Sequence, residues 1–132
     1  MSTNNQNELM AQQFRSQLRK FSTASVGVES CALVTFDGLI RASVLGDAVD
    51  GDRFGAMSAS LIALSTRASA ELNRGVLRQI ILDCELGPVI LTQAGTAGVL
   101  AVASTSGANL GKLIYDTRAT AHALLQIHNG NV

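Results

Sequence analysis

Residues 50–74 read DGDRFGAMSASLIALSTRASAELNR, and this stretch organises the fold. Acidic side chains stand at its start, apolar side chains recur along it at helical spacing and Gly75 follows it, so it predicts one long helix. At about 100° per residue its side chains divide among three faces. The first face is large and apolar, and we expect it to pack on a sheet: Phe54, Met57, Leu61, Leu64, Ala68 and Leu72.

The second face of this helix holds small, uncharged side chains together with Ile62. Small side chains allow two helix axes to come close and to recover dispersion energy along a narrow strip. A symmetric second copy of the same helix is the simplest occupant, because a twofold axis lets one patch serve both subunits. The alternatives are that this face packs within its own chain or is solvated. The expected homodimer interface on this helix comprises Ala59, Ile62, Ala63, Thr66, Ser69 and Ala70.

The third strip of the helix carries its only charges beyond the first turn, and we expect it to meet solvent or a partner. The partner-binding candidates are Ser60, Arg67, Glu71 and Arg74. Residues 76–82, directly after the helix, can form an edge strand whose unpaired amides would be satisfied by a second copy. This strand adds three residues to the expected dimer interface, Leu77, Gln79 and Ile81.

Working outward, Asp37-Gly38 between two β-prone runs predicts a hairpin of strands 29–36 and 39–45. Turn residues then separate three further strands, 76–83, 89–93 and 98–104. Apolar runs without alternation in the last two strands indicate that both faces of the sheet are covered. Helices over 8–21 and 109–127 complete the order α-β-β-α-β-β-β-α. The sequence therefore predicts an α+β fold in which helices sandwich a five-stranded antiparallel sheet.

The chain has 132 residues, enough for one domain, which we place at 8–128 between a flexible polar tail 1–7 and a C-terminal tail 129–132. Ten basic side chains balance ten acidic ones, which argues against a nucleic-acid partner. Charged residues make up 15%, below the ~25% of ordinary domains, so we expect a second protein to cover part of the surface. Without a signal peptide or an uninterrupted apolar span, the expected location is the cytoplasm.

Candidate chemical motifs are incomplete throughout the chain. Residues 107–112, GANLGK, have three residues between the glycines where a phosphate-binding loop has four, so a turn and helix cap is the better interpretation. His122 and His128 are six apart and do not share a helix face, while Cys31 and Cys84 have the apolar settings of packed side chains. We expect no catalytic residues, no metal, no cofactor and no small-molecule substrate.

Three segments carry a family resemblance: residues 31–40 (CALVTFDGLI), the small-residue helix over 54–72, and residues 108–113 (ANLGKL) opening the last helix. Across residues 7 to 127 the chain resembles stand-alone members of the roadblock/dynein-light-chain family, in the bacterial branch that regulates Ras-like GTPases. The resemblance rests on the whole pattern, because no single motif is diagnostic.

This resemblance implies a sheet ordered 2-1-5-4-3, with the central helix on one face and both terminal helices on the other. It also implies a homodimer that joins the third strands and sets the central helices side by side. The implied function is non-catalytic: the dimer binds a Ras-like small GTPase and modulates its GTP hydrolysis or location. The alternative is a dimeric scaffold or motor-type adaptor that binds peptide segments of a larger complex without a GTPase.

Overall fold

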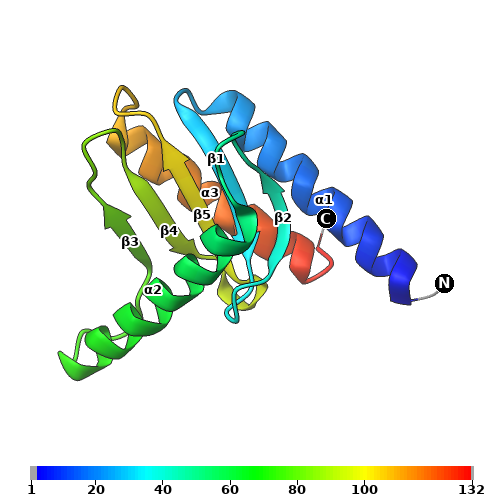
Figure 1. The fold of residues 1–132 in the computed structure, drawn as a ribbon. Helices are drawn as coiled ribbons and strands as arrows, with labels where there is room; N and C mark the ends of the chain where they lie inside the picture. Colours follow the sequence, from blue (N-terminus) through cyan, green and yellow to red (C-terminus); the bar gives the residue numbers. More distant parts are fainter. Residues whose placement is uncertain (1–2, 132) are drawn as a thin grey trace.

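Helices cover both faces of a five-stranded antiparallel sheet in the computed structural model, which describes residues 3–131 (Figure 1). The strand order is β2-β1-β5-β4-β3, and every neighbouring pair is antiparallel. The expected α+β class, order of elements and sheet order are confirmed. The elements are α1 (Thr3–Ala24), β1 (Val28–Val34), β2 (Ile40–Val44), α2 (Gly51–Glu71), β3 (Gln79–Leu82), β4 (Val89–Gln93), the 3₁₀ helix η1 (Gly95–Ala97), β5 (Val99–Ser104) and α3 (Leu110–His128).

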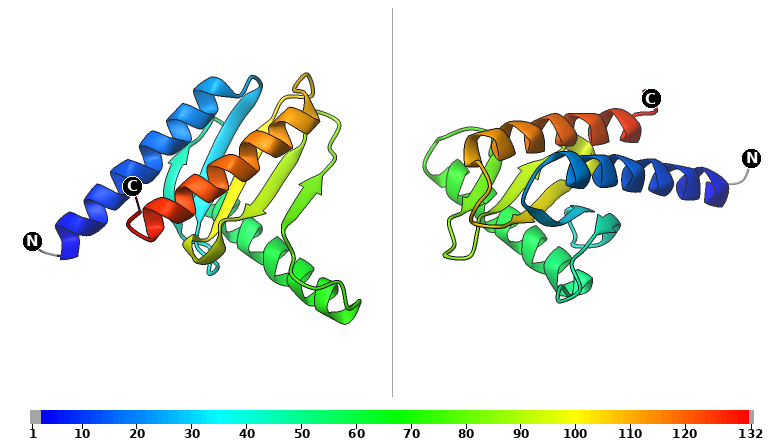
Figure 2. Two further views of the ribbon diagram at one scale, coloured as in Figure 1. Left: turned by 180° about the vertical axis from the view of Figure 1, so that it is seen from behind. Right: turned by 90° about the horizontal axis from the view of Figure 1, so that it is seen from above.

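Helices α1 and α3 lie on one face of the sheet, and α2 lies on the other (Figure 2). The α1/α3 side holds the larger core cluster, in which Phe14 and Leu18 of α1 and Leu124 of α3 are buried against the sheet. A smaller cluster lies under α2, where Ile62 meets the sheet side chains of Val34 and Leu91, among others. These two cores explain why β4 and β5 are apolar on both faces.

Some element ends differ from the expected ones. Helix α1 begins at Thr3 and so includes residues 3–7, which we expected in the polar tail. Strand β3 is shorter than the expected 76–83, because Val76 is 86% exposed and pairing with β4 starts at Gln79. Residues 1, 2 and 132, which belong to the expected tails, lie outside the described residues.

Helix α2 has a side-chain cap at its start and a left-handed residue at its end. The Asp50 carboxylate accepts a hydrogen bond from the Arg53 backbone N–H at 3.2 Å. At the other end Asn73 adopts φ 55°, and the Arg74 N–H donates to the Ser69 carbonyl as in a Schellman motif. Asn73, and not Gly75 as expected, is therefore the residue that ends the helix. Asparagine tolerates this conformation better than most residues.

The two apolar faces of α2 are divided between sheet and solvent differently from the prediction. Gly55, Ala59 and Ile62 of the small-residue face are buried on the sheet, whereas Met57 and Leu64 of the bulky face are 59% and 64% exposed. Gly55 and Ala59 allow the helix axis to come close to the sheet, while Ile62 fills the cluster between them. The expected division is therefore correct for Phe54 and Leu61, which pack on the cluster under α2, and for the exposed Ala63, Thr66 and Ala70. It is wrong for the residues named above.

Helix α2 also extends past the edge of the sheet at its C-terminal end (Figure 1). Its last large apolar side chain, Leu72, is 66% exposed. The overhang therefore leaves part of the helix without a layer of the same chain beneath it.

None of the helices within residues 3–131 has the length and hydropathy that a membrane crossing requires.

Candidate functional site

The surface of α2 that points away from the sheet is the first candidate site. We call it the outer face, and it consists of Met57, Ser60, Leu64, Arg67 and Glu71, all of them exposed. These residues recur at spacings of three, four and seven, so they form one strip along the helix. Two large apolar side chains within a polar strip are typical of a protein-binding surface.

The four residues expected to bind a partner are all exposed on or just beyond α2. Ser60, Arg67 and Glu71 belong to the outer face, whereas Arg74 follows the end of the helix. Their exposure leaves the partner-binding role untested, and it stays a prediction. Sequence reasoning missed the apolar members of the strip, Met57 and Leu64, because it assigned them to the core.

The length of the helix signals the exposure of its C-terminal end, including Leu72, but not that of Met57 in its second turn. A helix of 21 residues spans about 31 Å. The longest strand, β1, has seven residues and spans about 23 Å. A helix longer than the sheet beneath it must overhang, so part of its apolar surface has no partner in its own chain.

A groove of about 670 Å³ runs along one flank of α2, and we call it the α2 groove. The α2 wall of the groove consists mostly of small side chains. The opposite wall comes from the β1–β2 hairpin, the segment before β3 and the end of β4. Most of the side chains around it are apolar or uncharged. Its lining residues are Phe36, Ala59, Ile62, Ala63, Thr66, Arg67, Ala70, Gly75, Val76, Leu77 and Gln93.

The residues expected in the dimer interface separate into two groups. Ala59 and Ile62 are 8% and 4% exposed, so most of their surface is covered within the chain, but both also line the α2 groove and their place in a dimer interface stays a prediction. Four others line the open α2 groove and stay candidates: Ala63, Thr66, Ala70 and Leu77.

The remaining expected interface residues lie near the α2 C-terminus and on β3. The Ser69 hydroxyl donates a hydrogen bond to the Gly75 carbonyl at 2.8 Å, which fixes the chain after α2. The Gln79 side chain accepts a hydrogen bond from Arg118, and Ile81 is 38% exposed. Within residues 3–131, strand β3 is at the edge of the sheet and pairs only with β4. One side of its backbone is therefore open to pairing with another strand.

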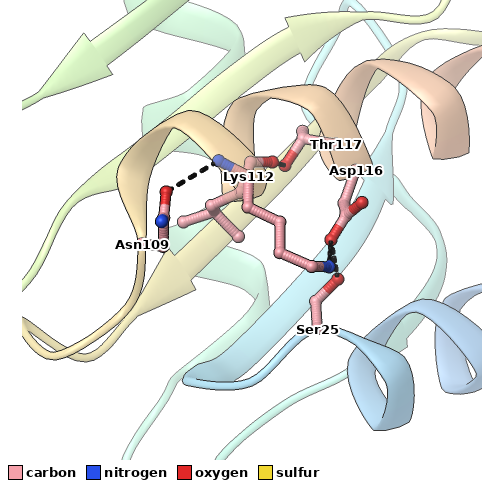
Figure 3. Close-up of polar contacts among 6 residues, drawn as sticks. Ser25, Asn109, Lys112, Asp116 and Thr117 are labelled. Atoms are coloured by element: carbon pink, nitrogen blue, oxygen red, sulfur yellow. Dashed lines mark hydrogen bonds and ion pairs between the residues drawn. The ribbon is translucent and has the colours of Figure 1, made fainter.

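The GANLGK segment is the start of a helix and not a phosphate cradle (Figure 3). The Asn109 side chain accepts a hydrogen bond from the Lys112 backbone N–H at 3.0 Å and so caps α3. The Lys112 ammonium turns toward Asp116, 2.7 Å from its carboxylate, which also accepts a hydrogen bond from Ser25. Lys112 is the main cause that lowers the pKa of Asp116, with Ser25 adding to it. The cluster ties the end of α1 to α3.

The histidines and cysteines do not converge on one centre. His122 is exposed on α3, and the His128 ring nitrogen Nδ1 lies 3.0 Å from an Arg41 guanidinium nitrogen. Cys31 is buried in β1, where desolvation raises the pKa of its thiol to about 11, and Cys84 is exposed. No group of three or more potential metal ligands occurs within residues 3–131.

Comparisons with known proteins agree with this architecture. The family model for the Roadblock/LC7 domain matches residues 16–104. An uncharacterized protein of Methanocaldococcus jannaschii is 34% identical over 85 residues, which cover 64% of this chain and 74% of that protein.

Solved structures share the fold at low identity. MglB of Myxococcus xanthus superimposes with a TM-score of 0.85 at 14% identity, covering 92% of each chain. A Roadblock/LC7 domain from Streptomyces avermitilis gives a TM-score of 0.78 at 20% identity, covering 83% of this chain and 92% of that one. MglC of Myxococcus xanthus gives 0.59 at 22% identity, covering 85% and 96%.

Proposed function

We propose, from the premise that this chain belongs to the Roadblock/LC7 domain family, that it is a non-catalytic homodimeric platform that binds a Ras-like small GTPase and modulates its GTP hydrolysis or location. The observation that carries the proposal is the outer face of α2, where Met57 and Leu64 are exposed beside Arg67 and Glu71. An apolar pair within charged neighbours is suited to a protein partner.

The dimer in this proposal uses the α2 groove and the free edge of β3. These two features adjoin, because Val76 and Leu77 line the groove and lead directly into β3. A second copy can fill the groove with its own α2 and satisfy the open backbone of β3 in the same encounter. Small residues in the groove wall, Ala63 and Ala70 among them, permit the close approach of that helix.

The GTPase in this proposal contacts the outer face. Once a second copy occupies the groove flank, the outer faces of two α2 helices lie on the same side of the dimer and form one broad surface. Met57 and Leu64 then supply buried apolar contacts, while Arg67 and Glu71 supply polar contacts at the rim. The platform acts by holding the GTPase in one conformation and donates no catalytic group.

The test measures binding and GTP hydrolysis with each Ras-like small GTPase encoded in the same genome. We expect the wild-type chain to bind at least one of them and to change its hydrolysis rate. Leu64→Glu should abolish both effects, because it places a charge in the centre of the outer face. Tyr115→Glu is the matched control, since Tyr115 is a large side chain 73% exposed on α3 at the opposite layer. Absence of binding by the wild-type chain to every GTPase contradicts the proposal.

A peptide-binding adaptor is the second candidate function. The free edge of β3 beside an apolar groove also suits an extended peptide, which can add a strand to the sheet and place side chains in the groove. This function predicts capture of disordered peptide segments regardless of whether GTP or GDP is present. The GTPase platform predicts partners that are folded GTPases and a response to the nucleotide.

A further inference from the structure

A second hollow lies on the opposite side of the sheet from α2, between α3 and the segment that leads into β3. We call it the α3 cleft, and its volume is about 420 Å³, within the range of small-ligand sites. Helices α1 and α3 leave β3 uncovered on this side (Figure 2). Its lining residues are Val76, Leu77, Arg78, Thr92, Gln93, Ala94, Gly95, Arg118, Ala121, His122 and Leu125.

The α3 cleft is basic. Arg78, Arg118 and His122 line it, and its lining includes no aspartate or glutamate. Among residues 3–131 the ion pairs join Arg53 with Asp50 and Lys112 with Asp116, so neither cleft arginine has a carboxylate partner. Two unpaired guanidinium groups beside one cleft attract an anion, and the planar donors of arginine suit a carboxylate.

Arg118 is exposed and makes one side-chain hydrogen bond. Its Nε donates a hydrogen bond to the Gln79 side-chain oxygen at 3.2 Å, which links α3 to β3 across the cleft. The bond engages only Nε, and the two terminal nitrogens of the guanidinium carry no hydrogen bond to the described residues. Both terminal nitrogens are therefore available to an anionic ligand.

Thr92 adds an independent observation. Its side chain lines the cleft and is 5% exposed, and its hydroxyl oxygen is the buried side-chain polar atom within residues 3–131 that lacks a hydrogen-bond partner. A buried hydroxyl without a partner is unfavourable, and proteins usually satisfy such groups with water or a ligand. The oxygen itself is sealed from solvent, so only a molecule that displaces neighbouring atoms of the cleft wall would reach it.

The rest of the cleft is apolar. Ala94, Ala121 and Leu125 form one side of it, and Leu77 stands on the other. A bare inorganic anion would leave these surfaces without contact, whereas an apolar body attached to a carboxylate covers them. The composition of the walls therefore selects an amphiphilic acid.

We propose that the α3 cleft binds a carboxylate carried on a small apolar body, with Arg78 and Arg118 holding the carboxylate and the Leu77 and Leu125 walls holding the body. This chemistry occurs in a free aliphatic acid and in the C-terminal residue of a polypeptide. The site lies on the face of the sheet opposite the outer face of α2, where the proposed GTPase would bind. The cleft and the α2 groove share Val76, Leu77 and Gln93 as lining.

The test follows NMR shifts of the arginine side chains and of the Thr92 backbone in the full-length chain. The probes are octanoate, its uncharged analogue octanamide, inorganic phosphate, and a short peptide ending in leucine with a free or an amidated C-terminus. We expect saturable shifts at Arg118 and Thr92 with octanoate, or with the free-acid peptide if the natural source is a polypeptide. Octanamide, phosphate and the amidated peptide should bind at least about tenfold more weakly.

Two variants complete the test. Arg78→Gln with Arg118→Gln should weaken the acid probe at least about tenfold. Arg19→Gln, an exposed arginine on α1, should bind as the wild type does. Arg118→Lys keeps the charge, and its affinity for the acid probe should lie between those of the double variant and the wild type. Equal binding of octanoate and octanamide, unchanged affinity in the double variant, or no saturable shift with either acid up to about 10 mM overturns the proposal.

Discussion

Gly55 of α2 lies against the carbonyl of Gly38 in the β1–β2 turn. A Cβ atom added at Gly55 would come within 2.6 Å of the Gly38 oxygen, closer than non-bonded atoms allow. This contact sets how near α2 comes to the hairpin, and it explains why the small-residue face of the helix is the one that packs on the sheet. Met57 and Leu64 are on the opposite side of the helix and stay exposed.

Gly55→Ala is expected to destabilise the fold. Alanine favours a helix by about 1 kcal/mol over glycine, but the overpacking at Gly38 costs roughly 1–3 kcal/mol. We expect a net loss of roughly 0–2 kcal/mol in the free energy of unfolding, measured by urea denaturation. The control is Gly111→Ala near the start of α3, where an added Cβ meets nothing closer than 3.5 Å. That variant should be neutral or slightly more stable.

Ala63→Glu is expected to separate the proposed dimer without unfolding the chain. Ala63 is exposed on α2 and lines the α2 groove, so a glutamate there is tolerated by one copy but places a charge in the interface with a second. Light scattering should give the mass of a single chain for this variant. Ala119→Glu, an equivalent change at an exposed alanine of α3, should leave the mass as in the wild type.

The Lys112–Asp116 pair predicts a specific acid response. The ammonium of Lys112 lowers the pKa of the Asp116 carboxyl below its usual range. A carboxyl with a lower pKa in the folded state stabilises the fold above its unfolded pKa of about 3.9, and this contribution is lost as the pH falls through the folded value. In Lys112→Gln, an NMR titration should show the Asp116 pKa moved upward. An unchanged titration would show that the pair has no influence.

The two cysteines should differ in reactivity toward Ellman's reagent. Burial raises the pKa of the Cys31 thiol to about 11, so the reactive thiolate is scarce and inaccessible in the native chain, whereas Cys84 is exposed. The native chain should therefore react at Cys84 alone, and both thiols should react in urea. Native Cys84→Ser should be inert; rapid reaction of that variant would mean that β1 is accessible in the folded state.

The element order could be predicted from the sequence because the turns between elements are encoded by a few adjacent residues. Asp37-Gly38 defines the first hairpin, and the turn at 94–97, seen as η1, separates β4 from β5. The ends of β3 and α2 were predicted less accurately. They depend on where β4 offers a partner and on Asn73 entering the left-handed region, which are properties of the packed chain.

The orientation of α2 could not be predicted from its own residues. Apolar side chains surround most of that helix, so its hydrophobic pattern does not select a face. The selection comes from Val34 and Leu91 of the sheet, which already fill the interface, and from the close approach of Gly55 to Gly38. The α3 cleft could not be predicted from the sequence either, because Arg78, Thr92 and Arg118 come from three separate segments.

The most direct test of the central claim is the mass in solution of the chain alone and mixed with a Ras-like GTPase of the same organism, loaded with a GTP analogue. The claim predicts that the chain alone has about twice the 13.8 kDa of one copy. It also predicts that the mixture forms a heavier species, which Leu64→Glu prevents and Tyr115→Glu does not. A mass of 13.8 kDa together with a GTPase that elutes separately would contradict the account.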